Sequence, residues 1–98
     1  MILITGADLL AMQEAALTIF DAGHIPIIGE WFASPMTALP ACGATFDELF
    51  QPLAERLLLR ADSVLRLEGN SPAADTVVRL ARSQGLRVFF NIEDVLAG

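Results

Sequence analysis

The chain has 98 residues, of which 54% are hydrophobic and 18% are charged. This length predicts a single domain over residues 1–98, and the composition is too apolar for a disordered chain. Twelve acidic residues against six arginines, with no lysine, give a formal net charge of −6. Without a basic cluster we expect no binding to nucleic acid or to an anionic membrane surface. The longest apolar stretches fall far short of the ~20 residues that a membrane span needs.

The first residues of the chain, its single cysteine and its single histidine bear on its cellular location and on metal binding. Residues 1–6 carry no basic side chain, so we expect no signal peptide. A single cysteine, Cys42, excludes an internal disulfide and most cysteine-based metal sites. The single histidine, His24, has no second histidine with which to share a metal ion. We therefore expect a cytoplasmic protein without a metal or a cofactor.

Short apolar runs alternate with helical patterns from the start of the chain. Residues 2–5 form an apolar, mostly β-branched run, which predicts a strand buried on both faces. Asp8 stands at the N-cap position of a helix that we expect over 9–22. A second strand follows over 25–28, with Pro26 either at its first position or on a sheet edge.

The segment over 29–45 differs from its neighbours because its apolar residues show no periodicity. We expect it to be a long loop, and long ordered loops in compact domains tend to be functional or to form interfaces. Its tryptophan, Trp31, follows the second predicted strand and is placed to close over the end of the sheet.

The second half of the chain continues the alternation. Thr45 or Asp47 caps a helix that runs to about residue 60, and Pro52 either kinks this helix or delays its start to Gln51. The remaining predicted elements are a strand over 63–67, a helix from Ser71-Pro72 to residue 84, a strand over 86–90 and a helical turn over 92–96.

Four apolar strands that alternate with three helices predict an α/β fold. We expect a flavodoxin-like parallel sheet with strand order 2-1-3-4 and helices on both faces. Such sheets bind ligands beyond the carboxyl ends of the strands, where the strand order reverses, which here is between the first and third strands. We expect the ligand-binding residues to be Thr5, Gly6, Asp8, Asn70 and Ser71, with Trp31 as a stacking lid.

Two glycine and helix-start features bear on phosphate binding. Gly6 lacks the two further glycines of a dinucleotide fingerprint, and Asp8 at the start of the next helix repels a phosphate. These features argue against a classical nicotinamide site. Ser71 begins a later helix, where it is either an ordinary N-cap or a contact for an anion or a hydroxyl. Both roles stay open at this point.

Several short motifs occur in a recognisable order along nearly the whole chain. They are a strand ending in a glycine turn, helix ends at 22–24 (Ala-Gly-His) and 61–62 (Ala-Asp), a Gly-x-Ser helix start at 69–71 and the segment 84–88. This order resembles the nucleoside 2-deoxyribosyltransferase-like superfamily, especially its small bacterial members of uncharacterised function. The resemblance implies a flavodoxin-like sheet, a dimer or larger assembly, and cleavage of N-glycosidic bonds of nucleosides or nucleotides.

The resemblance also implies where the catalytic glutamate should lie, in the motif Ser-x-Gly-x-x-x-Glu. Ser71 matches the serine, but Ala73 stands at the glycine and Val77 at the glutamate. An aspartate expected one helix earlier is Ala54. Valine cannot attack a sugar, so we expect a degenerate catalytic site that binds a nucleotide or a similar ligand. Asp75 cannot replace the glutamate, because two residues along a helix are a rotation of about 200°.

Two alternatives remain open. Glu68 at the end of the third strand, or Glu30 at the end of the second, would act as the acid of a working N-glycosidase or deoxyribosyltransferase. The other alternative is a homo-oligomeric interaction module that binds no ligand. A domain of this size leaves much of its apolar surface exposed, so we expect a homodimer.

Overall fold

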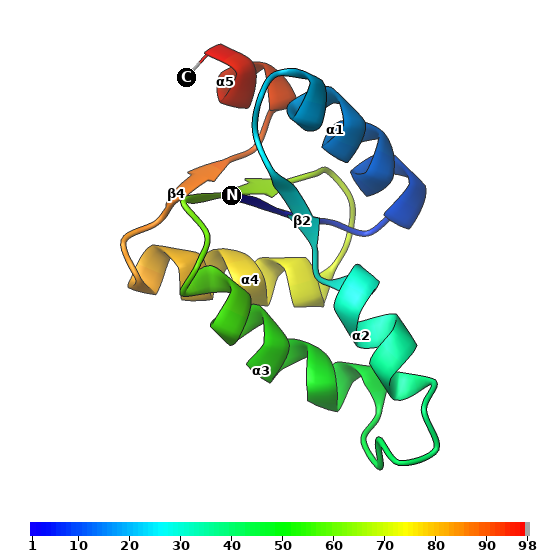
Figure 1. The fold of residues 1–98 in the computed structure, drawn as a ribbon. Helices are drawn as coiled ribbons and strands as arrows, with labels where there is room; N and C mark the ends of the chain where they lie inside the picture. The colour runs from blue at the N-terminus through cyan, green and yellow to red at the C-terminus, as the bar shows by residue number, and fades with distance from the viewer. Residues whose placement is uncertain (98) are drawn as a thin grey trace.

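The computed structural model describes residues 1–97 and shows one four-stranded parallel sheet with helices on both of its faces (Figure 1). The elements are β1 (Ile2–Thr5), α1 (Leu9–Asp21), β2 (Pro26–Ile28), α2 (Glu30–Thr37), α3 (Phe46–Leu58), β3 (Ser63–Arg66), α4 (Pro72–Ser83), β4 (Arg87–Phe89) and α5 (Ile92–Ala97). The strand order is β2-β1-β3-β4, which confirms the predicted flavodoxin-like α/β fold. Within the described chain, none of the helices has the length and apolar character needed to cross a membrane.

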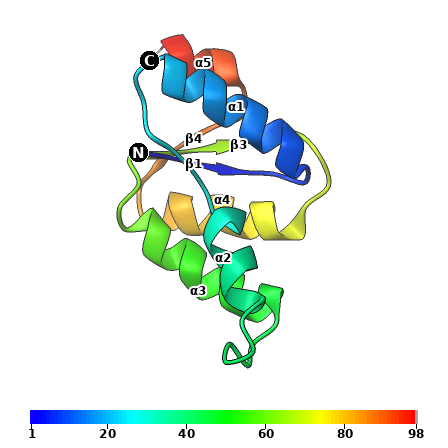
Figure 2. The same cartoon turned by 45° about the vertical axis from the view of Figure 1, so that its right-hand side comes forward.

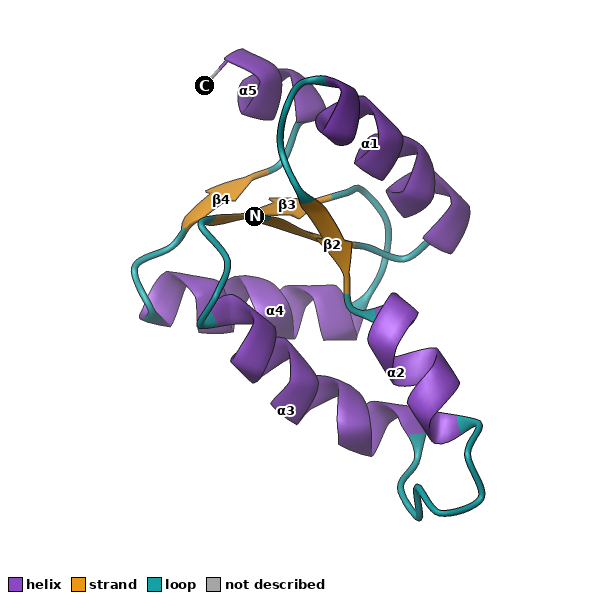
Figure 3. Ribbon diagram, in the orientation of Figure 1, coloured by secondary structure: helices purple, strands orange, loops and turns teal. Residues whose placement is uncertain are grey.

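The helices form two layers around the sheet. α1 and α5 cover one face, while α3 and α4 cover the other (Figures 1 and 2). α2 continues from the end of β2 and packs beside α3 (Figure 3). β1 pairs with β2 on one edge and with β3 on the other, and all of its residues are buried. A strand enclosed in this way must be apolar throughout, as this one is.

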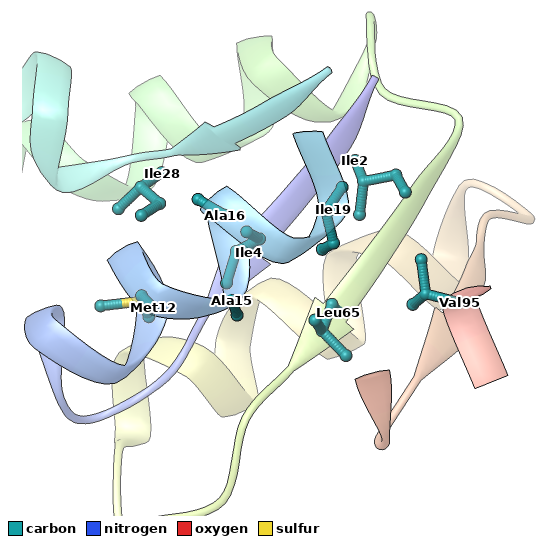
Figure 4. Packing of buried hydrophobic residues seen from close by; sticks show 9 residues of the cluster. All are labelled: Ile2, Ile4, Met12, Ala15, Ala16, Ile19, Ile28, Leu65 and Val95. Carbon is teal, nitrogen blue, oxygen red and sulfur yellow. The ribbon is translucent and has the colours of Figure 1, made fainter. Parts of the chain in front are cut away.

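Alternate side chains of the strands enter two separate hydrophobic cores. The core under α1 and α5 includes Ile4, Met12, Ile19, Leu65 and Val95 (Figure 4). The core under α3 and α4 includes Leu3, Ala54, Leu58, Val64 and Val77. Each fully buried aliphatic side chain stabilises the fold by roughly 1.5–3 kcal/mol relative to an exposed one. The central sheet is therefore held between two apolar layers. Because its strands are parallel, the segments that follow all of them start at the same edge, the carboxyl edge.

Side-chain caps begin three of the helices. Asp8, Thr45 and Ser71 have extended backbones at the starts of α1, α3 and α4. Each side chain accepts a hydrogen bond from a backbone N–H two or three residues later, at 3.1 to 3.2 Å. Thr45, and not Asp47, caps α3, where it forms a capping box with Glu48.

The segment 29–45 contains α2, so its prediction as a loop is wrong. The helix starts at once after β2, with Gly29 already helical and without a side-chain cap. Only Ala33 is fully buried, and Pro35 lies inside the helix. The sequence therefore shows neither a helical periodicity of apolar residues nor a capping residue for this helix. Residues 38–45 form the shorter connection that remains.

Two prolines, Pro26 and Pro52, lie inside regular elements without ending them. Pro26 is the first residue of β2, and β2 lies on an edge of the sheet, so both predicted positions apply. Pro52 lies inside α3, which runs from Phe46 to Leu58, so a start at Gln51 is wrong. Because Pro52 has no N–H, the carbonyl of Glu48 lacks its helical hydrogen-bond donor. Pro52 is exposed, so water can donate to this carbonyl instead, which reduces the cost.

Candidate functional site

A cavity of about 530 Å³ lies at the carboxyl edge of the sheet, between α3 and α4. β1 brings Thr5 and Gly6 to this edge, and the connection from β3 to α4 brings Asn70 and Ser71. The first residue of α2, Glu30, completes the edge. The cavity therefore occupies the place where the strand order reverses, which is where such sheets bind ligands.

The walls of the cavity are largely apolar. α3 contributes Phe46 and Phe50, whose rings stack with centroids 5.4 Å apart and 18° between their planes. α4 contributes Val77 and Leu80. Sequence reasoning missed this aromatic pair, although a spacing of four residues places two side chains on the same face of a helix. A flat ring that enters the cavity can stack on these aromatic side chains.

The rim of the cavity is polar and carries negative charge. The lining includes the carboxylates of Glu30 and Asp47, and no Lys, Arg or His belongs to it. Burial raises the pKa of the Glu30 carboxyl, and a hydrogen bond from its own backbone N–H opposes this effect. A rim of this kind favours a neutral or cationic ligand over an anionic one.

Two glycines allow close packing around the cavity. A Cβ at Gly29 would lie 2.7 Å from Cε2 of Phe50, although the backbone there is ordinary with φ −58°. Gly69 has φ +126°, and a Cβ there would lie 2.9 Å from Cβ of Ala7. The first glycine leaves room for the Phe50 ring in the cavity wall. The second permits the tight turn that precedes Asn70.

Arg66, the last residue of β3, braces the turn between β3 and α4. Its guanidinium donates hydrogen bonds to the carbonyl oxygens of Leu67 and Gly69. It also forms an ion pair with the carboxylate of Asp75, with Nη2 2.9 Å from Oδ1. The arginine side chain is only 10% exposed. Sequence spacing did not indicate this brace, because two of its partners lie in the connection after β3 and the third, Asp75, lies on α4.

The predicted ligand-binding residues divide into two groups. Four of them line the cavity: Thr5, Gly6, Asn70 and Ser71. Asp8 instead caps α1, and Trp31 is 40% exposed on α2, outside the lining. The stacking role that the sequence assigns to Trp31 is available to Phe46 and Phe50, because α3 and not α2 forms this wall.

The candidate acids also divide. Glu30 lines the cavity, whereas Glu68 lies in a separate groove beside α1 and α5. Val77 and Ala54, where the resemblance implies carboxylates, both lie in the cavity wall and are 1% and 3% exposed. Asp75 is exposed and outside the lining. The wall therefore has no carboxylate at the two implied positions, and acids reach the cavity only from its rim.

Over residues 1–97, no group of three or more His, Cys, Asp and Glu side chains is arranged to hold a metal ion. Comparisons with models of protein families, with curated proteins and with solved structures found no match to this chain. The fold class therefore rests on the strand order and the helix layers alone. The family resemblance stays a prediction from the sequence.

Proposed function

We propose that the protein binds a nucleoside, or a similar small molecule with a flat ring and hydroxyl groups, in the cavity between α3 and α4. The observation that carries this proposal is the pairing of the stacked rings of Phe46 and Phe50 with polar groups on Asn70 and Ser71. The ring of the ligand would pack on the aromatic wall, and its hydroxyls would meet the polar edge. The cavity volume falls within the range of roughly 300–1,000 Å³ that is usual for small-molecule sites.

The charge of the rim favours a nucleoside over its 5′-monophosphate. Glu30 and Asp47 would repel a phosphate, and no cationic side chain in the lining would offset them. The N-terminus of α4, at Ser71, offers roughly half a positive charge. Two carboxylates outweigh this partial charge, so the phosphate should weaken binding.

The cavity wall supports binding without catalysis. At the position where the resemblance implies a nucleophilic glutamate, the side chain of Val77 is 1% exposed and belongs to the core between the sheet and α4. A hydrocarbon side chain can neither form a glycosyl intermediate nor transfer a proton.

A working N-glycosidase is the second candidate, and Glu30 is the observation that favours it. Its carboxyl group lines the cavity, and burial raises its pKa. A raised pKa keeps a larger fraction of the group protonated, as a general acid requires. Glu68 does not share this position, since it lies outside the lining.

An NMR titration of the ¹⁵N-labelled protein with nucleosides and their 5′-monophosphates tests the proposal. We expect saturable shifts at the amides of Gly6, Asn70 and Ser71, larger affinity for the nucleosides, and no release of free base. Release of base that Glu30→Gln abolishes and Glu68→Gln leaves unchanged would replace the proposal with the N-glycosidase. The absence of shifts at millimolar ligand would contradict both and leave the interaction module.

A further inference from the structure

We propose that a groove between α1 and α5 binds a cationic, amphipathic segment of a partner protein. The groove has a volume of about 430 Å³ and is lined by residues of α1 and α5. These helices lie on the face of the sheet opposite α3 and α4 (Figure 2). The groove is therefore separate from the cavity described above, and its occupant differs in chemistry.

Apolar residues form part of the lining of the groove. α1 contributes Ala11 and Ala15, α5 contributes Ile92, and the segments that follow β3 and β4 contribute Leu67 and Phe90. The alanines are small, so they leave room for a larger side chain from a partner. Phe90 as a residue remains 48% exposed. An amphipathic helix typically lays its apolar side chains into a groove of this kind.

The charged residues that line the groove are all acidic. Glu14 comes from α1, Glu68 from the turn after β3, and Glu93 from α5. No Lys, Arg or His lines the groove. A cationic partner would gain electrostatic attraction here, whereas an acidic one would be repelled.

Most of the net negative charge of the chain lies on the side of the sheet that holds the groove. The α1 and α5 side carries six acids, namely Asp8, Glu14, Asp21, Glu68, Glu93 and Asp94, and one arginine, Arg87, whose guanidinium lies over the ring of Phe89. The other six acids accompany the five remaining arginines, which lie on or next to α3, β3 and α4. The side that holds the groove therefore has a formal charge of −5, and the other side has a formal charge of −1.

Two other occupants fit these observations less well. A metal ion needs converging ligands, and the described residues provide no such group of acids. A second copy related by two-fold symmetry would place this acidic side against itself, which costs repulsion. Arg82, at the end of α4, is outside the lining of the groove, and its guanidinium carbon lies 5.7 Å from the ring centroid of Phe90.

Fluorescence anisotropy with a labelled synthetic peptide tests this proposal. The probe is an amphipathic helix of leucine and lysine, and its comparison peptide has the same composition in a scrambled, non-amphipathic order. We expect saturable binding of the amphipathic peptide that weakens as salt is added, because the paired charges are exposed. The scrambled peptide should bind at least about tenfold more weakly, because it cannot present an apolar face to the groove.

A matched pair of charge reversals locates the binding surface. Glu14→Arg lies in α1 beside the groove, and Glu55→Arg lies in α3 on the other side of the sheet; both residues are exposed within helices. We expect the first to weaken the peptide about tenfold at low salt and the second less than about twofold. Equal effects of the two variants, or equal binding of the two peptides, would overturn the proposal. So would a change in the sedimentation of the protein alone in Glu14→Arg, which would point to a second copy.

Discussion

Ser71 has two roles: its hydroxyl caps α4, and the residue lines the proposed binding cavity. Its Oγ accepts a hydrogen bond from the N–H of Ala74 at 3.1 Å, and Ala74 is fully buried. Loss of an N-cap costs about 1 kcal/mol in general, within a range of about 0.5–2 kcal/mol. Water reaches the buried N–H of Ala74 poorly, so we expect Ser71→Ala to cost about 1.5 kcal/mol. For a domain of about 100 residues, this corresponds to a Tm lower by about 6–12 °C.

A second cap supplies the control for this prediction. Thr45→Ala removes the exposed cap of α3, whose side chain does not line the cavity. We expect a Tm loss in both variants, measured by calorimetry, but weaker nucleoside binding only in Ser71→Ala. Ser71→Asn should restore the stability, because asparagine caps helices well. An unchanged Tm in Ser71→Ala would refute the argument for the cap, and an equal loss of binding in Thr45→Ala would refute the direct contact.

Four further changes test other parts of the molecule. Gly29→Ala should cost about 1–3 kcal/mol in urea unfolding and weaken the nucleoside, because its Cβ would displace the Phe50 ring; unchanged stability and binding would contradict this. Burial raises the pKa of Glu30, so the wild-type protein loses stability as pH rises above the ordinary value of 4.5 and through the raised value. Glu30→Gln should therefore be the more stable protein at pH 7 but not at pH 3; an equal difference at both would contradict the pKa shift. Arg66→Ala removes three hydrogen bonds and should cost about 1–3 kcal/mol, measured in the same assay, with Arg79→Ala as its control. The homodimer stays a prediction that sedimentation tests. Met36 is exposed on α2 together with Trp31 and Phe32, so Met36→Asp should yield a monomer if these side chains form the interface, and a wild-type monomer would end this expectation.

Much of the fold follows from local patterns in the sequence. The fully apolar run over residues 2–5 predicts the central strand, because only a strand covered on both faces can bury every side chain. Asp8 and Ser71 predict the starts of α1 and α4, since capping depends on atoms only two or three residues apart. Interactions of this range are visible without a structure.

The misses come from tertiary contacts. α2 has no side-chain cap and one fully buried residue, so its position depends on packing against α3 and not on a local pattern. The same packing explains why Phe46 and Phe50 form the aromatic wall while Trp31 stays outside it. The carboxyl edge of the sheet could be predicted as the place of the cavity, but the helix that closes it could not.

The turn between β3 and α4 connects the two proposed sites. Glu68 lines the groove beside α1 and α5, and Asn70, two residues later, lines the cavity. Arg66 holds the turn between them through its hydrogen bonds to two carbonyl oxygens. A change at Arg66 should therefore weaken both the peptide and the nucleoside, whereas a change at Ser71 should affect the nucleoside alone. The two variants together distinguish a turn that supports both surfaces from two surfaces that merely lie near each other.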